Sequence, residues 1–225
     1  MKLAKQQVDI GLSTNNLGPV LAFWQQQPGI RFDHVLPIRP GHDQHRHDIG
    51  GSVLKINHHD SPLPANRPSG YRELLIAQPG LTEPTRLADP DGNRLMLVPH
   101  GHDGVTQIGV RIAVRDLDAH RRFYGAALGL AEERPGRFRA GASVVILEQQ
   151  PEAPDDAQMQ GPGWRYITFQ VFKVDEEHAA VLAKGGREAL APITLGTTAR
   201  ISMVRDPDGN WIELSQRASI VGTLD

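Results

Sequence analysis

The chain has 225 residues, and its 24 lysines and arginines nearly balance its 26 aspartates and glutamates. This balance gives no overall field that would draw the protein onto nucleic acid or an anionic membrane, so we expect a small-molecule partner and neither a nucleic-acid nor a membrane partner. The absence of cysteine excludes disulfides, thiolate nucleophiles and cysteine-bound metals. No apolar run is long enough for a membrane span, and the first residues lack the apolar core of a signal peptide, which predicts a cytoplasmic protein.

An internal repeat divides the chain into two halves. Alternating apolar residues give way to helical spacing over 8–24 and again over 109–124. An Asn or Asp stands at each change and can cap a helix, so both segments predict a strand followed by a helix. Each half then contains a short run rich in β-branched residues, 51–57 and 142–148, which predicts a further strand.

The sequence Asp-Pro-Asp-Gly-Asn occurs at 89–93 and again at 206–210, each time before a strand pattern. Proline presets one turn dihedral and glycine supplies a positive φ, so each copy predicts a hairpin turn. From the repeat we predict two domains, residues 1–100 and residues 105–217, joined by a polar, glycine-containing linker.

The two halves differ in the segment before the hairpin. Apolar residues have helical spacing over 175–185, whereas 78–86 is a short segment containing Pro and Gly. We therefore predict that the first domain has lost its second crossover helix. Residues 149–163, rich in Pro, Asp and Gln, predict a long loop in the second domain, of the kind that forms a lid or is disordered.

This order of strands, helices and hairpins resembles the vicinal oxygen chelate superfamily, which includes glyoxalase I, extradiol dioxygenases and bleomycin-resistance proteins. The resemblance is most specific over 108–130, 166–186 and 201–214. It implies an α+β fold with two tandem glyoxalase-like domains, built from paired βαβββ modules that form curved mixed sheets. A small-molecule site would lie on the concave face of such a sheet.

The resemblance also implies positions for the ligands of a divalent metal. The family's last-strand carboxylate corresponds to Glu213, its first-strand histidine to Gly109 and its second-module histidine to Tyr166. In the first half the first-strand position is Asp9, and Lys55 stands where glyoxalases have a further glutamate. The usual His, His and Glu triad is therefore absent, and loss of the metal is the interpretation we favour, although the cofactor stays unassigned.

Five histidines, which include His45 and His47, lie between residues 42 and 59. If 42–48 is a strand, His45 and His47 face the same way, as two metal ligands would. Glycines and a proline on both sides favour instead a hairpin tip with solvated histidines. We predict no metal site; if a metal does bind, Glu213 or the pair of His45 and His47 is the predicted ligand.

Strand alternation places the candidate site residues on one concave face of the second domain. Glu213 is predicted to be a general base and Tyr166 a proton donor. The alternatives are an internal salt bridge for Glu213 and a packing wall for Tyr166. The predicted substrate-binding side chains are Arg111, Gln107, Trp164 and Trp211.

Two functions agree with these residues. The first, which we favour, is an enzyme of lyase, isomerase or dioxygenase type that acts on a small oxygenated organic compound in the second domain, with a degenerate first domain. The absent triad argues against oxygen activation and leaves proton transfer, isomerisation or lyase chemistry. The alternative is a binding protein that sequesters an aromatic or cationic compound, as bleomycin-resistance proteins do. The sequence leaves open the substrate and whether a homodimer completes the site.

Overall fold

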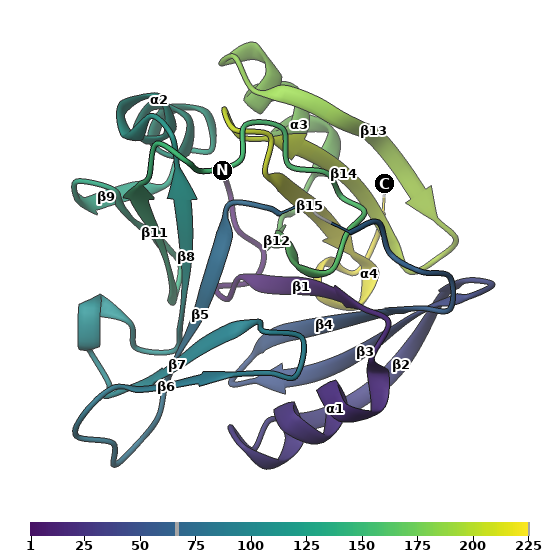
Figure 1. Ribbon diagram of the computed structural model, residues 1–225. Coiled ribbons are helices and arrows are strands. Elements are labelled where there is room, and N and C mark those ends of the chain that lie inside the picture. Colours follow the sequence, from purple (N-terminus) through teal and green to yellow (C-terminus); the bar gives the residue numbers. More distant parts are fainter. Residues whose placement is uncertain (66–67, 225) are drawn as a thin grey trace.

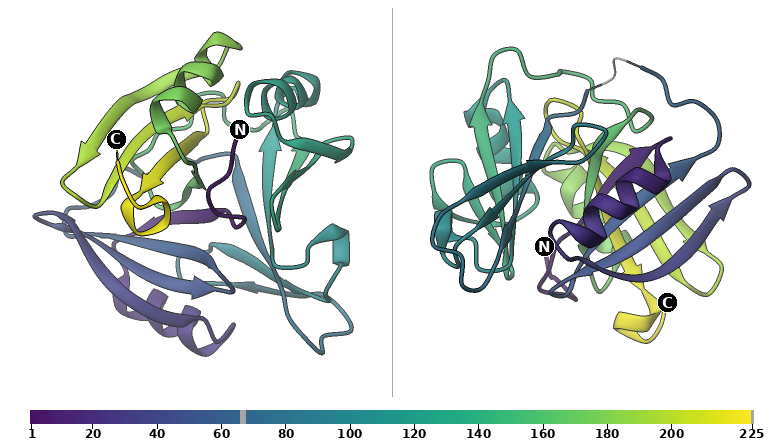
Figure 2. Two further views of the ribbon diagram at one scale, coloured as in Figure 1. Left: turned by 180° about the vertical axis from the view of Figure 1, so that it is seen from behind. Right: turned by 60° about the horizontal axis from the view of Figure 1, so that its bottom comes forward.

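The computed structural model describes residues 1–65 and 68–224, and its strands form two curved mixed sheets (Figure 1). The views in Figure 2 show the two sheets side by side, with the N-terminal segment between them. This segment contacts both sheets, because Leu3 forms a bridge with Val171 and the Gln6 carbonyl accepts a hydrogen bond from the Ala142 amide. The predicted α+β fold with curved mixed sheets is confirmed.

The larger sheet has eight strands in the order β13-β14-β15-β12-β1-β4-β3-β2. At its centre β1 pairs antiparallel with β12, and each of these strands has a parallel neighbour on its other side, β4 and β15 respectively. The bounds are β1 Asp9–Thr14, β2 Arg31–Arg39, β3 His42–Ile49, β4 Ser52–His59, β12 Gly163–Gln170, β13 Arg187–Leu195, β14 Ala199–Arg205 and β15 Trp211–Arg217.

The smaller sheet has seven strands in the order β6-β7-β5-β8-β11-β10-β9. Its central pair is β5 with β8, which are antiparallel. The bounds are β5 Tyr71–Ala77, β6 Thr85–Ala88, β7 Arg94–Val98, β8 Ile108–Val114, β9 Ala131–Arg134, β10 Arg137–Ala140 and β11 Ser143–Gln149.

Each sheet therefore takes strands from both halves of the chain. The chain forms four modules in succession; the first pairs with the fourth and the second with the third. The expectation that residues 1–100 and 105–217 each build a sheet of their own is wrong. The predicted linker instead carries a short 3₁₀ turn, η1 His102–Gly104, between two strands of one sheet. Module sequences alone do not select between these pairings, because either one buries the same kind of strand edge.

The described helices are short: α1 Leu17–Gln26, α2 Leu117–Arg122 with its π-helical continuation η2 Phe123–Ala127, α3 Val174–Ala183 and α4 Ala218–Val221. The predicted strand-to-helix starts are both present, and the predicted helix at 175–185 corresponds to α3. Residues 78–84 connect β5 to β6 without a helix. Asp116 caps α2 by accepting from the Ala119 amide, whereas Asn16 makes no side-chain cap on α1. None of the described helices is long and apolar enough to cross a membrane.

The two Asp-Pro-Asp-Gly-Asn segments form the predicted turns and also anchor helices. In each turn the first aspartate accepts hydrogen bonds from the backbone amides two and four residues later. The carboxylate of Asp89 also accepts from Trp24 Nε1 of α1, and the carboxylate of Asp206 accepts from the Tyr124 hydroxyl of η2. Because each turn holds a helix of another module, the repeated motif fixes how the apolar side of the helix packs on its sheet.

Candidate functional site

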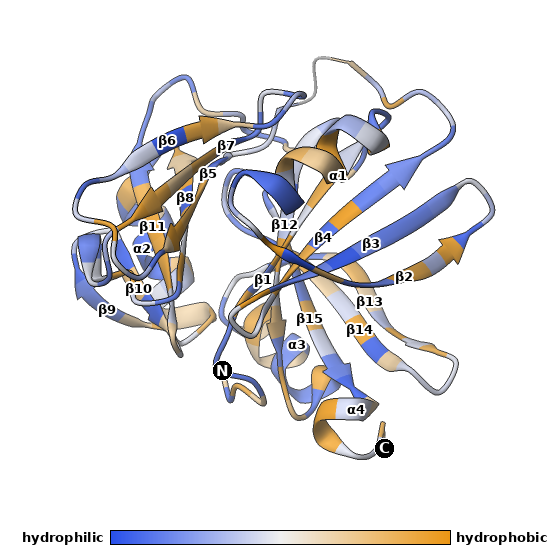
Figure 3. Ribbon diagram, turned by 90° about the horizontal axis from the view of Figure 1, so that it is seen from below, coloured by the Kyte–Doolittle hydropathy of each residue, from blue (hydrophilic) through white to orange (hydrophobic). Residues whose placement is uncertain are grey.

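The concave face of the seven-stranded sheet is filled by its own side chains. A cluster of buried apolar residues occupies it, and in Figure 3 the central strands β5, β7 and β8 are largely hydrophobic. The members of this cluster are Leu75, Met96, Val98, Val105, Val144 and Ile146. This packing leaves the eight-stranded sheet, whose β3 is mostly hydrophilic in the same view, as the place for a polar site.

The concave face of the eight-stranded sheet encloses a cavity of about 180 Å³. Most of its polar lining is buried, although His42 and Arg217 are partly exposed and Thr198 is exposed. Two apolar residues at its rim, Ile38 and Leu195, are each 45% exposed. The polar residues that line it are His42, Gln44, Arg46, Lys55, Asn57, Tyr166, Thr198, Glu213, Ser215 and Arg217. It is smaller than other depressions on the molecule, but it combines a buried acid with a buried base.

Lys55 and Glu213 form a buried ion pair in this cavity. Lys55 Nζ lies 2.6 Å from Glu213 Oε2, and the side chains are 5% and 11% exposed. Thr168 joins them, because its hydroxyl accepts from Lys55 at 2.7 Å and donates to Glu213 Oε2 at 2.6 Å. Burial lowers the pKa of Lys55, and the Glu213 carboxylate opposes this shift by favouring the charged ammonium.

Strand register brings these three residues together. Thr168 pairs with Glu213 across β12 and β15, and Lys55 pairs with Gly11 across β4 and β1. Gly11 also pairs with Tyr166, and a Cβ atom at Gly11 would overlap the Tyr166 ring. Only a glycine at this position lets the tyrosine lie across β1 into the cavity.

A chain of hydrogen bonds fixes the Tyr166 hydroxyl. Arg46 donates to Gln44 Oε1 at 2.6 Å, so Gln44 Nε2 faces the other way and donates to Asn57 Oδ1 at 3.0 Å and to Tyr166 Oη at 3.3 Å. Asn57 Nδ2 donates to the Leu12 carbonyl and to Tyr166 Oη. Tyr166 Oη therefore accepts two hydrogen bonds and keeps its own proton for a further acceptor. Burial raises the pKa of Tyr166, so the phenol stays protonated at neutral pH.

Comparisons with known proteins agree with this fold. The model of the Glyoxalase/Bleomycin resistance protein/Dioxygenase superfamily matches residues 105–214. Residues 105–214 belong to this superfamily.

The structure of a point mutant of glyoxalase I from Zea mays is similar over 100% of this chain and 96% of its own, with a TM-score of 0.76 and 14% identity. Glyoxalase I from Zea mays is similar over 96% of this chain and 95% of its own, with a TM-score of 0.73 and 14% identity. A search of curated proteins finds no match. At this identity the structural likeness extends the superfamily's fold, and the fold alone, to the first half of the chain.

The cavity residues do not fit the divalent metal that superfamily resemblance implies. Such an ion needs three or four converging donors with free lone pairs. Lys55 places an ammonium group beside Glu213 instead, and Asp9 is already engaged by Lys5 Nζ at 2.6 Å and the Val53 amide at 2.8 Å. Across the described part of the chain, no three His, Cys, Asp or Glu residues gather as metal ligands.

Residues 42–48, predicted to form a hairpin tip, lie instead in the strand β3, so that prediction is wrong. His45 and His47 share the strand face opposite to the cavity. His47 is buried there against the Phe32 ring, and Gln25 lies 3.2 Å from its Nε2. His45 and His47 thus lie on the side of the sheet that carries α1 and form no part of the cavity.

On the cavity side, His42 of β3 stacks on His59 of β4 with 4.1 Å between ring centroids. Burial, together with repulsion from the neighbouring His42 and Arg39, lowers the pKa of His59 to about 4. In the unfolded chain His59 takes up a proton near pH 6.5, whereas in the folded chain it does so only near pH 4. We expect the free energy of unfolding to fall as pH drops through that window, measured by urea denaturation, and His59→Gln to flatten the dependence. An unchanged slope in His59→Gln would assign the dependence to other groups.

The structure separates Arg111 from Glu213 and Tyr166. Arg111 lies on β8 of the seven-stranded sheet, where its guanidinium is 3.4 Å from Glu73, 3.8 Å from Asp103 and 3.3 Å from Glu148. The prediction that it faces the same cavity is wrong, because β8 pairs with β5 and not with the strands of the fourth module.

Gln107 also lies away from the cavity. Its Nε2 donates to the Ile49 carbonyl at 2.6 Å and to Ser52 Oγ at 2.8 Å, while its Oε1 accepts from Ser143 Oγ at 3.1 Å. It thereby ties β4 of one sheet to β11 of the other. The predicted role in substrate binding does not agree with this position.

The two tryptophans do not line the cavity either. A β-bulge opposite Gly11 and Leu12 places Trp164 opposite Leu12 and Tyr166 opposite Gly11, so the pleat is interrupted between them. Trp164 consequently packs edge-to-face on Trp24 of α1. Trp211 stays on the Tyr166 face but lies under the 149–163 loop, donating to the Ala157 carbonyl at 2.9 Å. The predicted aromatic-lined cup is therefore reduced to Tyr166.

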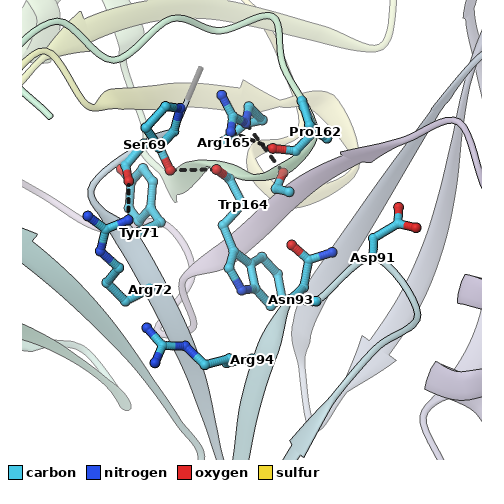
Figure 4. A pocket seen from close by; sticks show the side chains of 12 residues that line it. Ser69, Tyr71, Arg72, Asp91, Asn93, Arg94, Pro162, Trp164 and Arg165 are labelled. Carbon is cyan, nitrogen blue, oxygen red and sulfur yellow. Dashed lines mark hydrogen bonds between the residues drawn. The ribbon is translucent and has the colours of Figure 1, made fainter. Parts of the chain in front are cut away.

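Figure 4 shows a second cavity, of about 250 Å³, between the first hairpin and the start of β12. Arg72 and Arg94 lie near each other in it, and Trp164 forms part of its wall. Asp91, the acidic residue among the described ones that line it, is bonded to Thr14 and Asn16. No carboxylate in this second cavity is free to move a proton, which favours the Lys55 and Glu213 cavity as the site.

Proposed function

We propose that the chain is an enzyme of the glyoxalase and dioxygenase type that binds a small oxygenated organic compound in the eight-stranded sheet and moves a proton with Glu213. One observation carries this proposal. Lys55 and Thr168 both hold Glu213 Oε2, and none of the described residues bonds the other carboxylate oxygen, Oε1. A buried carboxylate that accepts hydrogen bonds on one oxygen is held in place, and its other oxygen is left to accept a proton from a substrate. Such a group is suited to general-base catalysis.

The side chains present support proton transfer next to a carbonyl group. Glu213 would take a proton from the carbon beside the carbonyl, and the C–H electron pair would form a carbon–carbon double bond as the carbonyl π pair moves to oxygen. The third N–H of Lys55 and the O–H of Tyr166 are available to stabilise that oxygen. For a hydroxyketone, return of the proton from Glu213 to the former carbonyl carbon, with the hydroxyl proton passing to the former carbonyl oxygen as the new carbonyl forms, completes an isomerisation. Return of the proton to the original carbon on its other face completes an epimerisation. The step needs no oxidant or reductant.

Deuterium exchange tests the proposal without knowledge of the natural substrate. In D₂O the enzyme is expected to accelerate exchange of the hydrogens beside the carbonyl in at least one of a set of 2-oxo acids and hydroxyketones, followed by proton NMR. Glu213→Gln keeps the size of the side chain and is expected to slow exchange by about 10²-fold or more. The matched control is Glu148→Gln, in the other sheet, which is expected to leave exchange unchanged. Exchange no faster than in buffer for every compound, or equal rates in both variants, would contradict proton transfer.

The alternative is a binding protein without catalysis. Apolar side chains around the rim, Leu36, Ile38, Ile201 and Met203, favour it because they could hold an apolar group without chemistry. The predicted stacking of a cationic compound between aromatic rings has lost its support, since Tyr166 alone lines the cavity among the three rings. A binder would show saturable affinity and no exchange. The cytoplasmic location and the homodimer stay predictions from the sequence.

A further inference from the structure

Arg46 is a buried cation without an acidic partner. It lies on β3, lines the cavity and is 5% exposed. Its guanidinium donates one hydrogen bond, to Gln44 Oε1. Its Nε is buried and has no hydrogen-bond partner. Among the described residues, no carboxylate lies within ion-pairing distance of it, in contrast to Arg111, which has three. A buried charge without a counter-ion is costly to the folded protein.

The surroundings of Arg46 make this cost larger. Its partner in register on β4 is Lys55, so two positive side chains stand directly opposite each other. Arg217 also lines the cavity. Burial is the largest cause that lowers its pKa, and repulsion from Arg46 is the second. Glu213 is the acid that lines the cavity in the described part of the chain, and it is bound to Lys55. Asp9 lies close enough to act on Lys55 and Arg217, but it is paired with Lys5. The three cations that line the cavity therefore face one lining carboxylate, which leaves the cavity in need of negative charge.

The hydrogen-bond chain beyond Arg46 points to the rest of the ligand. Because Arg46 donates to Gln44, the relay through Gln44 and Asn57 supplies only donors to Tyr166 Oη. Tyr166 therefore offers its proton to the cavity, and Lys55 has one N–H left after Thr168 and Glu213. A ligand that satisfies all three groups has an anionic group for Arg46 and an acceptor oxygen for Tyr166 and Lys55.

We propose that Arg46 is the anchor for the carboxylate of a small oxygenated carboxylic acid, with a second oxygen of the same molecule accepting from Tyr166 and Lys55. A planar carboxylate fits the guanidinium fork and supplies the missing charge. The inference rests on the proposed function for its cavity and deepens it by naming the substrate class. It does not depend on the proton-transfer step.

The test compares a carboxylate with its neutral ester. Binding of 2-oxobutanoate, and of methyl 2-oxobutanoate, is measured by calorimetry and by the shift in melting temperature. The native chain is expected to bind the acid and not the ester. Arg46→Met is expected to lose at least about tenfold in affinity for the acid. Arg46→Lys keeps the charge without the fork and is expected to fall between the two.

The matched control is Arg111→Met. Arg46→Met is expected to keep or raise the melting temperature of the free protein, because an unpaired charge is removed. Arg111→Met is expected to lower it, because Glu73 and Glu148 lose their cation while Asp103 keeps Arg137. It is also expected to bind the acid like the native chain. Equal affinity for acid and ester, unchanged affinity in Arg46→Met, an equal loss of stability in both variants, or no binding of 2-oxobutanoate at millimolar concentration overturns the inference.

The two proposals fail in distinguishable ways. Binding of the acid that depends on Arg46, with no deuterium exchange for any compound, upholds the carboxylate site and removes the proposed catalysis. Exchange of a neutral hydroxyketone that depends on Glu213 and is unaffected by Arg46→Met upholds the catalysis and removes the carboxylate site.

Discussion

Replacing Lys55 with methionine is expected to lower the free energy of unfolding by about 3–5 kcal/mol at mildly alkaline pH, the usual range for breaking a buried ion pair. Methionine fills a similar volume but leaves the Glu213 carboxylate buried with only the Thr168 hydroxyl on Oε2. Denaturation by urea, with circular dichroism as the readout, measures this loss.

A second substitution tests whether this loss comes from the ion pair. In Lys55→Met the buried Glu213 carboxylate keeps no opposite charge. The double variant Lys55→Met with Glu213→Gln removes both charges and is expected to recover most of the stability. If the double variant is no more stable than Lys55→Met, the two side chains do not interact as an ion pair.

Replacing Lys55 with glutamate is expected to create a divalent-metal site beside Glu213. The change removes the ammonium and places a second carboxylate beside Glu213 and the Thr168 hydroxyl. Repulsion between two buried carboxylates should make the metal-free variant less stable than the native chain. Mn²⁺ should reverse this, with a stabilisation of about 2.7 kcal/mol at a hundredfold excess over the dissociation constant. Melting temperature against Mn²⁺ concentration, together with calorimetry, measures it.

The control for the metal experiment is Lys55→Gln, which removes the ammonium without adding a carboxylate. It is expected to gain no response to Mn²⁺, and adding Glu213→Gln to Lys55→Glu is expected to abolish the response. Stoichiometric Mn²⁺ bound by the native chain through Glu213 would mean that Lys55 leaves the carboxylate when metal is present, and it would reverse our interpretation of the donor set.

Local patterns in the sequence predicted the elements and the superfamily well. The repeated strand-to-helix starts at 8–24 and 109–124, the two hairpins and the helix near 175–185 each depend on neighbouring residues, so their signals are readable without the fold. The placement of Tyr166 and Glu213 in one cavity is also readable from the sequence, because the two residues lie on adjacent strands of one module. The sequence does not predict Arg46 and Gln44 as site residues, because the glycines and proline around the segment 42–48 favour a hairpin tip. Recognised as a strand, its alternation would have placed both opposite Lys55 and Asn57.

The sequence by itself determined the modules, the turns and the last-strand acid, because each follows from side-chain period or turn chemistry over a few residues. Only the tertiary structure decided which modules share a sheet, and with it the site. Lys55 meets Glu213 across 158 residues because β1 pairs with β12, and the same choice sends Arg111 to the other sheet. The bulge in β12 turns Trp164 away from Tyr166, since one extra residue reverses the face of every side chain before it. Pairing and bulges are set by the packing of whole strands against one another, and a pattern counted along a single strand does not contain that information.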